Sequence, residues 1–215
     1  MRTLIKLTCF LMLLPAFAAN AQTSTFAFRD GVDFQTLARP VATEDPSKIE
    51  LAEVFWYGCI HCYNLEPALV DFESGLPDDV NKVRVPAMWA ASMELHAKIY
   101  YASKALGINE DIHWPVFQAM NEDRNPLGSE AAIYSLIEDL GHDPDTFERA
   151  FNSFGVTSQI AQATSKAAAY GVRGTPELII NGKYRISTSM TGTQAQMLVV
   201  AEALIDRERE LLQAQ

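Results

Sequence analysis

Two cysteines in the stretch Cys59-Ile60-His61-Cys62 are separated by two residues, a spacing that lets thiols close a small, strained and easily reduced disulfide. Such a disulfide breaks and re-forms when a thiolate attacks one of its sulfur atoms. The pattern therefore predicts redox chemistry at Cys59 and Cys62.

The flanking residues place this pair where a strand ends and a helix begins. Residues 49–57 have the apolar, β-branched and aromatic character of a strand, and Gly58 ends it. The residues after Cys62 carry apolar side chains at helical spacing, namely Leu65, Ala68, Leu69 and Phe72. A helix N-terminus offers unpaired backbone N–H groups and the positive end of the helix dipole, which both favour a thiolate.

The first 21 residues have the composition of a secretory signal peptide. Arg2 and Lys6 precede an apolar run, residues 7–19, that is too short to span a bilayer. Cleavage is expected after the small-x-small pattern of residues 19–21, with residues 16–18 as the alternative site. An uncleaved anchor is a further alternative.

Cysteine usage separates redox chemistry from structural roles. Cys9 should leave with the signal peptide, so Cys59 and Cys62 would be the cysteines of the mature chain. A secreted domain that uses disulfides as staples usually carries several pairs between distant segments. Zinc normally needs four ligands, and no second half is evident near Cys59, Cys62 and His61. The other histidines, to which we assign no role, are His96, His113 and His142. We expect no metal and no cofactor.

Composition limits the partners. The chain has 17 Lys and Arg against 27 Asp and Glu, a formal net charge of −10, and the expected mature chain is more acidic still. Nucleic acid and anionic membrane surfaces are therefore not expected to bind. With 48% hydrophobic residues, the chain can bury one large domain, or a domain with an insertion.

Periodicity outlines the remaining elements. Residues 82–85 alternate as a strand that Pro86 closes, and residues 92–158 are almost entirely helical. A further helix runs to Gly171. Strand character returns at residues 177–180, before a hairpin turn at Asn181-Gly182 and a partner strand. A last helix opens with Thr193 and Gln196 in capping-box spacing. Without the helical block of residues 92–158, the remaining elements form a small mixed sheet flanked by helices. We therefore interpret the block as an insertion.

These motifs together resemble the DsbA family of periplasmic thiol:disulfide oxidoreductases. The resemblance is carried by residues 55–62 followed by Pro67, by Gly174-Thr175-Pro176 before a strand, and by residues 181–184. It covers nearly the whole mature chain. It implies an α/β protein with a thioredoxin fold and an inserted all-helical domain: residues 22–88 and 159–215 form the thioredoxin-like domain, and residues 89–158 the insertion. Ile60 departs from the family pattern, because members commonly have proline at this position. This difference affects the expected redox potential but not the expected fold.

The resemblance implies roles for the motif residues. Cys59 would be the exposed nucleophile and Cys62 the buried resolving cysteine, with His61 stabilising the Cys59 thiolate. A low pKa of Cys59 stabilises the reduced protein but not the disulfide, which makes the protein an oxidant.

Three further residues match family positions. Thr175 and Pro176 would form a substrate-binding loop opposite the cysteines with a cis peptide bond; an ordinary trans proline beginning an edge strand is the alternative. Glu53 would be a buried acid that relays a proton for Cys62, the alternative being a solvated strand residue. Lys82 is a candidate partner for Glu53, or a surface lysine.

Aromatic residues near the cysteines have two interpretations. Trp56, Tyr57 and Tyr63 form either an apolar docking rim or part of the core. Trp89 and Trp114 are expected, like Met88, Met93 and Met120, in the core of the helical insertion.

The sequence thus predicts a soluble, monomeric periplasmic dithiol oxidase that transfers its disulfide to unfolded, newly exported polypeptides. The family implies reoxidation by a quinone-linked partner in the inner membrane. A reductase or isomerase is the main alternative, favoured by Ile60 and by threonine before Pro176. A binding module for unfolded chains with incidental thiols is the alternative from another class.

Overall fold

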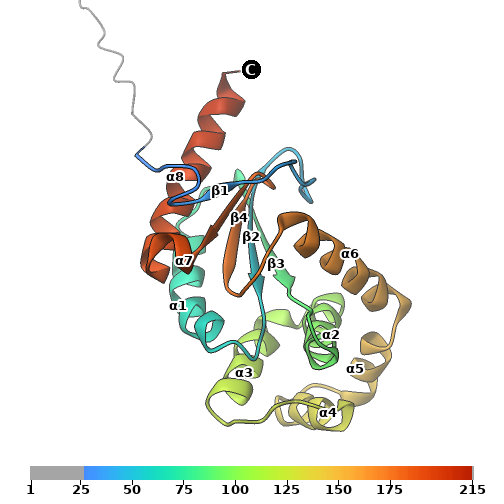
Figure 1. Cartoon of the computed structure of the whole chain (residues 1–215). Coiled ribbons are helices and arrows are strands. Elements are labelled where there is room, and N and C mark those ends of the chain that lie inside the picture. The colour runs from blue at the N-terminus through green and yellow to red at the C-terminus, as the bar shows by residue number, and fades with distance from the viewer. Residues whose placement is uncertain (1–26, 215) are drawn as a thin grey trace, which may run out of the picture.

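The structure, a computed structural model, describes residues 27–214. The expected signal peptide, its cleavage sites and Cys9 lie outside the described residues. Within them, a five-stranded mixed sheet has the order β1-β5-β4-β2-β3 (Figure 1). The strands are β1 (Gln35–Thr36), β2 (Ile49–Phe55), β3 (Val80–Pro86), β4 (Glu177–Ile180) and β5 (Tyr184–Ser187). β2 pairs in parallel with β3 and antiparallel with β4.

Helices account for most of the remaining described chain. They are α1 (Ile60–Ser74), α2 (Ala91–Leu106), α3 (Asn109–Asn121), α4 (Glu130–Asp139), α5 (Pro144–Phe151), α6 (Phe154–Tyr170), the single turn α7 (Thr188–Thr191) and α8 (Gln194–Gln213). No helix within residues 27–214 is both long and apolar enough to cross a bilayer.

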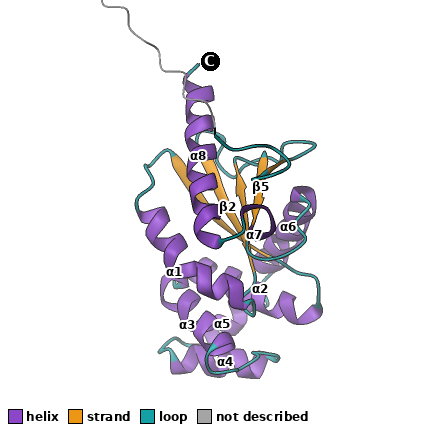
Figure 2. Ribbon diagram, turned by 60° about the vertical axis from the view of Figure 1, so that its left-hand side comes forward, coloured by secondary structure: helices purple, strands orange, loops and turns teal. Residues whose placement is uncertain are grey.

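Every residue of strand β2, which lies between β4 and β3, is buried, because helices cover both faces of the sheet (Figure 2). Side chains of a strand alternate between faces. Leu51 accordingly packs with Leu65 of α1 and Met197 of α8. Ala52 packs on the opposite face against Ala163 and other residues of α6. The sheet therefore holds the start of α1 firmly at the end of β2.

The helices α2 to α5 form a second body. It packs at the end of the sheet where β2 leads through Cys59 into α1 (Figure 1). Their apolar cluster includes Phe55 at the end of β2 and Cys62 of α1. Helix α6 belongs to both bodies, since Val156 lies in this cluster and Ala163 lies on the sheet. The α/β class with a helical insertion is confirmed. The division after residue 158 falls inside α6, and the exact bounds of the two parts stay a prediction.

Several local expectations can be compared with the structure directly. The turn at Asn181-Gly182 has positive φ angles of 50° and 60°, as a type I′ turn requires, and Lys183 N–H donates to Ile180 O at 2.9 Å. Lys183 therefore lies in the turn, and the partner strand β5 begins at Tyr184. Thr193 Oγ1 accepts from Gln196 N–H, which confirms that helix start.

Trp89 was wrongly placed in the core of the insertion. It is 55% exposed, because it lies in the segment between β3 and α2 rather than on a buried helix face. Met93, in the first turn of α2, is buried, but in the cluster on the sheet that includes Ala52 rather than in the core of the insertion.

Candidate active site

Cys59 and Cys62 lie at the first turn of α1, directly after β2. Cys59 is the N-cap of α1, and its backbone N–H donates to Trp56 O at 3.0 Å. Cys62 lies one helical turn further and is fully buried, whereas Cys59 is partly exposed. Both are free thiols in this structure. Only Cys59 is therefore accessible to a large substrate.

The surroundings of Cys59 favour its thiolate and lower its pKa to about 5. The largest cause is a hydrogen bond from the Cys62 thiol. Partial burial opposes the shift, while the side chain of Thr175 and the backbone N–H groups of Cys62 and His61 add to it. These two N–H groups belong to the first turn of α1, whose amides have no partner within the helix. The helix start thus contributes part of the stabilisation of the thiolate, as its position predicted.

His61 is exposed, and its contribution to the lowered pKa of Cys59 comes from its backbone N–H. The sequence suggested its imidazole for this purpose. A role for the imidazole stays a prediction.

Cys62 has the opposite properties. Burial raises the pKa of its thiol well above the ordinary value, and the hydrogen bond to Cys59 and the charge of Glu53 act in the same direction. Two thiols in one turn therefore differ strongly in acidity. One is suited to nucleophilic attack, and the other remains protonated.

The segment around Thr175 approaches Cys59 from the opposite side. Cys59 Sγ donates to the backbone O of Thr175 at 3.3 Å, and the Thr175–Pro176 bond is cis. Pro176 is buried next to β4, while Gly174 and Thr175 are partly exposed. The expected cis bond is thus present, and the loop lies against the reactive sulfur.

Glu53 is fully buried on β2, on the same sheet face as α1. Its Oε2 lies 2.8 Å from Nε of Arg84, the residue that pairs with it on β3. Burial nevertheless raises the pKa of Glu53 to about 8. Oε1 has no hydrogen-bond partner among the described residues. A buried carboxyl with one unpaired oxygen is well suited to hold a proton.

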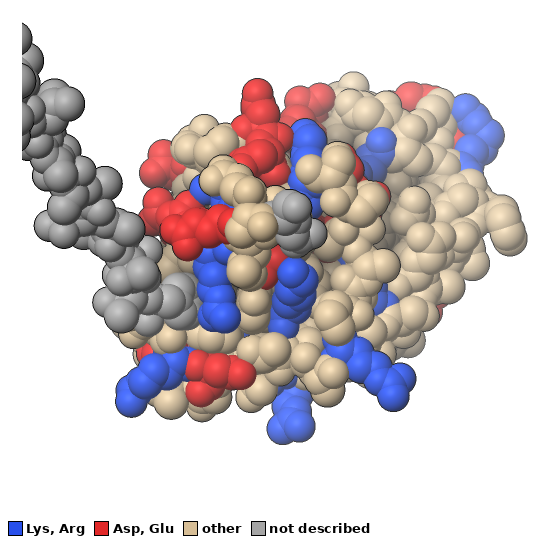
Figure 3. Space-filling model, turned by 90° about the horizontal axis from the view of Figure 1, so that it is seen from above, with Lys and Arg blue, Asp and Glu red and all other residues tan. Residues whose placement is uncertain are grey.

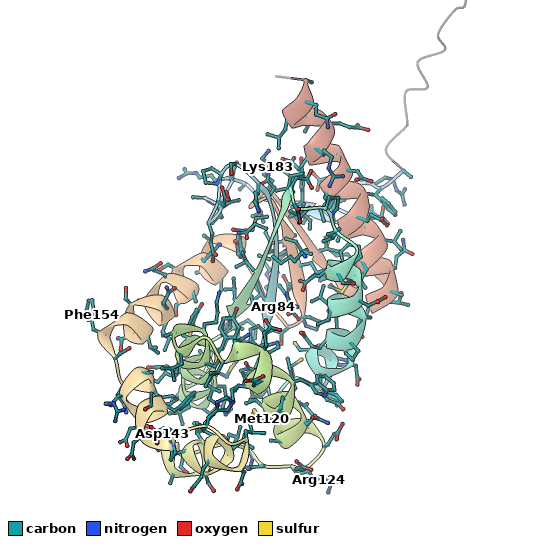
Figure 4. The ribbon with its side chains drawn as sticks, turned by 180° about the vertical axis from the view of Figure 1, so that it is seen from behind. Arg84, Met120, Arg124, Asp143, Phe154 and Lys183 are labelled. Carbon is teal, nitrogen blue, oxygen red and sulfur yellow. The ribbon has the colours of Figure 1, made fainter. Side chains whose placement is uncertain are left out.

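Arg84, and not Lys82, is the partner of Glu53. Lys82 is exposed, so the surface alternative for that residue is correct. The guanidinium of Arg84 also forms ion pairs with Glu66 and Glu73 of α1. Figure 4 shows Arg84 where β3 meets the helices of the insertion.

The sequence analysis identified Glu53 but missed the rest of this charged cluster, namely Glu66, Glu73, Arg84 and His113. His113 Nδ1 lies 2.7 Å from the hydroxyl oxygen of Tyr57, and Nε2 lies 3.3 Å from Glu66 Oε1. Burial raises the pKa of Glu66, but hydrogen bonds from His113 and the charge of Arg84 outweigh it and lower that pKa overall. The helical spacing of Glu66 after Cys62 was a usable signal, whereas nothing local identifies His113.

Aromatic residues around the cysteines divide between core and rim. Tyr57 is buried and packs edge-on against Phe55. Trp56 is partly exposed and donates from Nε1 to His96 Nδ1 at 2.9 Å. Tyr63 stacks on Trp114 with a centroid distance of 5.0 Å. The docking-rim interpretation thus remains open for Trp56 and Tyr63, but not for Tyr57.

The insertion also contacts the backbone of the active-site turn. Asn121, the last residue of α3, donates from Nδ2 to Tyr57 O at 2.8 Å and to Phe117 O at 2.8 Å.

Within residues 27–214, no group of three His, Cys, Asp or Glu side chains is arranged to hold a metal ion.

Comparisons with known proteins find similar chains over nearly the whole length of this one. The DSBA-like thioredoxin domain matches residues 73–203. The thiol:disulfide interchange protein DsbA of Pseudomonas aeruginosa is 34% identical over 209 residues, which cover 97% of this chain and 98% of that protein. The protein of the same name from Azotobacter vinelandii is 34% identical over 196 residues, which cover 90% and 92%.

A solved structure extends the similarity to three dimensions. The crystal structure of Pseudomonas aeruginosa DsbA superimposes with a TM-score of 0.83 at 33% identity, covering 86% of this chain and 97% of that one. The sheet and the helical insertion described above therefore form a thioredoxin-like fold with an inserted helical domain.

Proposed function

The chain belongs to the DSBA-like thioredoxin domain family and is a thiol:disulfide oxidoreductase, and from this premise we propose that it is a dithiol oxidase for exported proteins. The lowered pKa of Cys59 is the observation that carries this proposal. A stabilised thiolate lowers the free energy of the reduced protein, while the disulfide form gains nothing from it. The protein therefore tends to give its disulfide away.

The reaction balances through the two cysteines. A substrate thiolate attacks Cys59 Sγ of the Cys59–Cys62 disulfide, the bond between the two protein sulfurs breaks, and Cys62 takes up a proton. A second substrate thiolate then attacks the substrate sulfur of the mixed disulfide, and Cys59 leaves as a thiolate. The substrate has lost two electrons and the protein has gained them.

Glu53 is proposed to supply the proton that Cys62 takes up. Its carboxyl is buried and its raised pKa keeps it protonated near neutral pH. Once ionised, its carboxylate raises the pKa of the Cys62 thiol, which favours a protonated Cys62. Arg84 would limit the cost of ionising Glu53 during transfer.

Thr175 and Pro176 are proposed to dock the substrate. The backbone O of Thr175 lies beside Cys59, so an extended chain bound at that sulfur would run along this segment. Main-chain hydrogen bonds of this kind do not depend on the side chains of the substrate. They suit an enzyme that acts on many unfolded, cysteine-containing polypeptides.

The cellular setting is part of the same proposal. We infer a periplasmic location from residues 1–21, reoxidation by a quinone-linked partner in the inner membrane, and a monomer as the working form. Figure 3 shows acidic and basic side chains interspersed on the face that lies at the top of Figure 1, at the end of the molecule away from the helical insertion.

One observation favours the reductase or isomerase alternative. Ile60 stands between the cysteines where the family commonly has proline, and it is 48% exposed beside Cys59. An apolar residue at that position changes the local environment of the reactive sulfur.

A redox titration against glutathione, followed by tryptophan fluorescence, tests the proposal. An oxidase should be half reduced in a buffer that still oxidises ordinary dithiols. Half reduction only in strongly reducing buffer would favour the reductase alternative. The Cys59→Ser/Cys62→Ser variant should lose all activity, whereas a binding module with incidental thiols would keep its binding.

A further inference from the structure

One hydrogen bond joins the cysteine-bearing helix α1 to helix α8. Gln194, the first residue of α8, donates from Nε2 to the backbone O of His61. A carbonyl oxygen only accepts hydrogen bonds, so the Gln194 amide must present its nitrogen there. The two residues are 133 positions apart, so only the fold brings them together.

The start of α8, which carries this side chain, is fixed by a helix cap and by packing against α1. Thr193 caps the helix by accepting from Gln196 N–H at 3.1 Å. The bodies of α1 and α8 pack in one apolar cluster, through residues such as Leu69 and Val200. Gln194 itself is partly buried.

The carbonyl of His61 belongs to the same peptide group as the backbone N–H of Cys62. That N–H is one of the donors that lower the pKa of Cys59. Hydrogen bonds in a chain polarise one another, so an amide that accepts at oxygen donates more strongly at nitrogen. The Gln194 amide, the peptide between His61 and Cys62, and the Cys59 sulfur thus form a continuous chain.

We propose that Gln194 is a positioning residue for Cys59, which orients and polarises the peptide between His61 and Cys62 and so favours the thiolate. Gln194 donates to neither sulfur, so it acts through this peptide group. The interaction strengthens when Cys59 carries charge and weakens in the disulfide. The inference rests on the proposed role of Cys59 as the nucleophile, but not on the direction of exchange.

The test compares Gln194→Met with Gln196→Met. Methionine keeps the length of the side chain and removes the donor. Gln196 is a matched control, because it lies in the same helical turn and its backbone, not its side chain, makes the capping bond. The pKa of Cys59, followed by thiolate absorbance, should rise by about 0.2 to 0.5 unit in Gln194→Met and stay unchanged in the control.

The equilibrium with glutathione provides a second readout. The rise in pKa corresponds to a shift of about two- to threefold toward the disulfide form. Gln194→Glu should raise the pKa of Cys59 further, because a carboxylate cannot donate and adds negative charge. If both variants keep the pKa of the parent protein, even with a lower melting temperature, Gln194 only packs and the proposal is wrong. That result would leave the oxidase proposal intact, since the potential of the parent protein decides it.

Discussion

Cys59 and Cys62 share one helical turn but differ in acidity because they differ in burial and in hydrogen-bonding role. The partly exposed sulfur of Cys59 accepts hydrogen bonds from Cys62, from the side chain of Thr175 and from the helix start, while the buried sulfur of Cys62 donates to Cys59. We therefore expect a single thiolate transition near pH 5 in the absorbance of the reduced protein. A midpoint near 8.5, the value of a free thiol, would contradict the assigned nucleophile.

Cys59→Ser is the control for that titration. It removes the acidic thiol and leaves Cys62, whose pKa is raised. The transition near pH 5 should disappear, and no new one should replace it below neutral pH.

Glu53 carries the second prediction at this scale. Its pKa is raised from 4.5 to about 8 in the folded protein. The stability contributed by its neutral form is therefore complete below pH 4.5 and is lost progressively as pH rises through about 8. Glu53→Gln keeps a neutral side chain at all pH values, so its free energy of unfolding relative to the parent protein should increase over this range.

The same variant should slow turnover, because glutamine cannot deliver a proton to Cys62. Glu73→Gln is the matched control, since Glu73 pairs with Arg84 but is not among the groups that shift the pKa of Cys62. Equal rates of disulfide exchange for Glu53→Gln and the parent protein from pH 5 to 8 would rule out the relay.

Among the elements, α3 connects the insertion to the active-site turn through Asn121. Asn121→Ala removes the side-chain donor to the backbone O of the buried residue Tyr57. An unsatisfied buried acceptor costs about 1–3 kcal/mol, which is a fall in melting temperature of roughly 2–12 °C for a chain of this size. Asn64→Ala, on the exposed side of α1, is the control and should melt like the parent protein.

Elements were predictable from sequence where contiguous residues encode them. The buried pattern of β2, the Asn181-Gly182 turn and the Thr193 cap depend on neighbours in the chain. Partners across elements were not predictable in the same way. Arg84 rather than Lys82 meets Glu53, because the register between β2 and β3 decides which basic residue lies opposite.

The same distinction applies to the candidate site. Cys59, Cys62, Thr175 and Pro176 carry recognisable motifs, so the sequence placed them correctly beside one another. His113 comes from the insertion and reaches the charged cluster only through the packing of α3 on α1. No spacing within the chain indicates such a contact.

At the scale of the whole molecule, the redox state should change stability. The pKa of Cys59 falls from 9.0 to about 5 on folding, and a lowered pKa contributes stability that is present above pH 9.0 and lost as pH falls through about 5. The disulfide closes only a very short loop, so it constrains the unfolded chain little. The reduced protein should therefore melt at a higher temperature than the oxidised protein, by a margin that grows between pH 5 and 9.

Thermal melts of both redox forms across this pH range check the expectation. The Cys59→Ser/Cys62→Ser variant should melt at the same temperature with and without reductant. A higher melting temperature for the oxidised protein would show that the disulfide acts as a structural staple.

The burial of Cys62 also determines how long the mixed disulfide between Cys59 and a substrate lasts. Once a substrate is joined to Cys59, two thiols compete for the mixed disulfide: Cys62, which would expel the substrate unchanged, and the second cysteine of the substrate, which completes the product. A thiol whose pKa is held well above its ordinary value is rarely ionised, so the internal route is slow. Slow attack by Cys62 therefore prolongs the mixed disulfide, which gives a flexible substrate time to bring its second thiol to the bond. The more slowly the substrate does so, the more the outcome depends on Cys62 staying protonated.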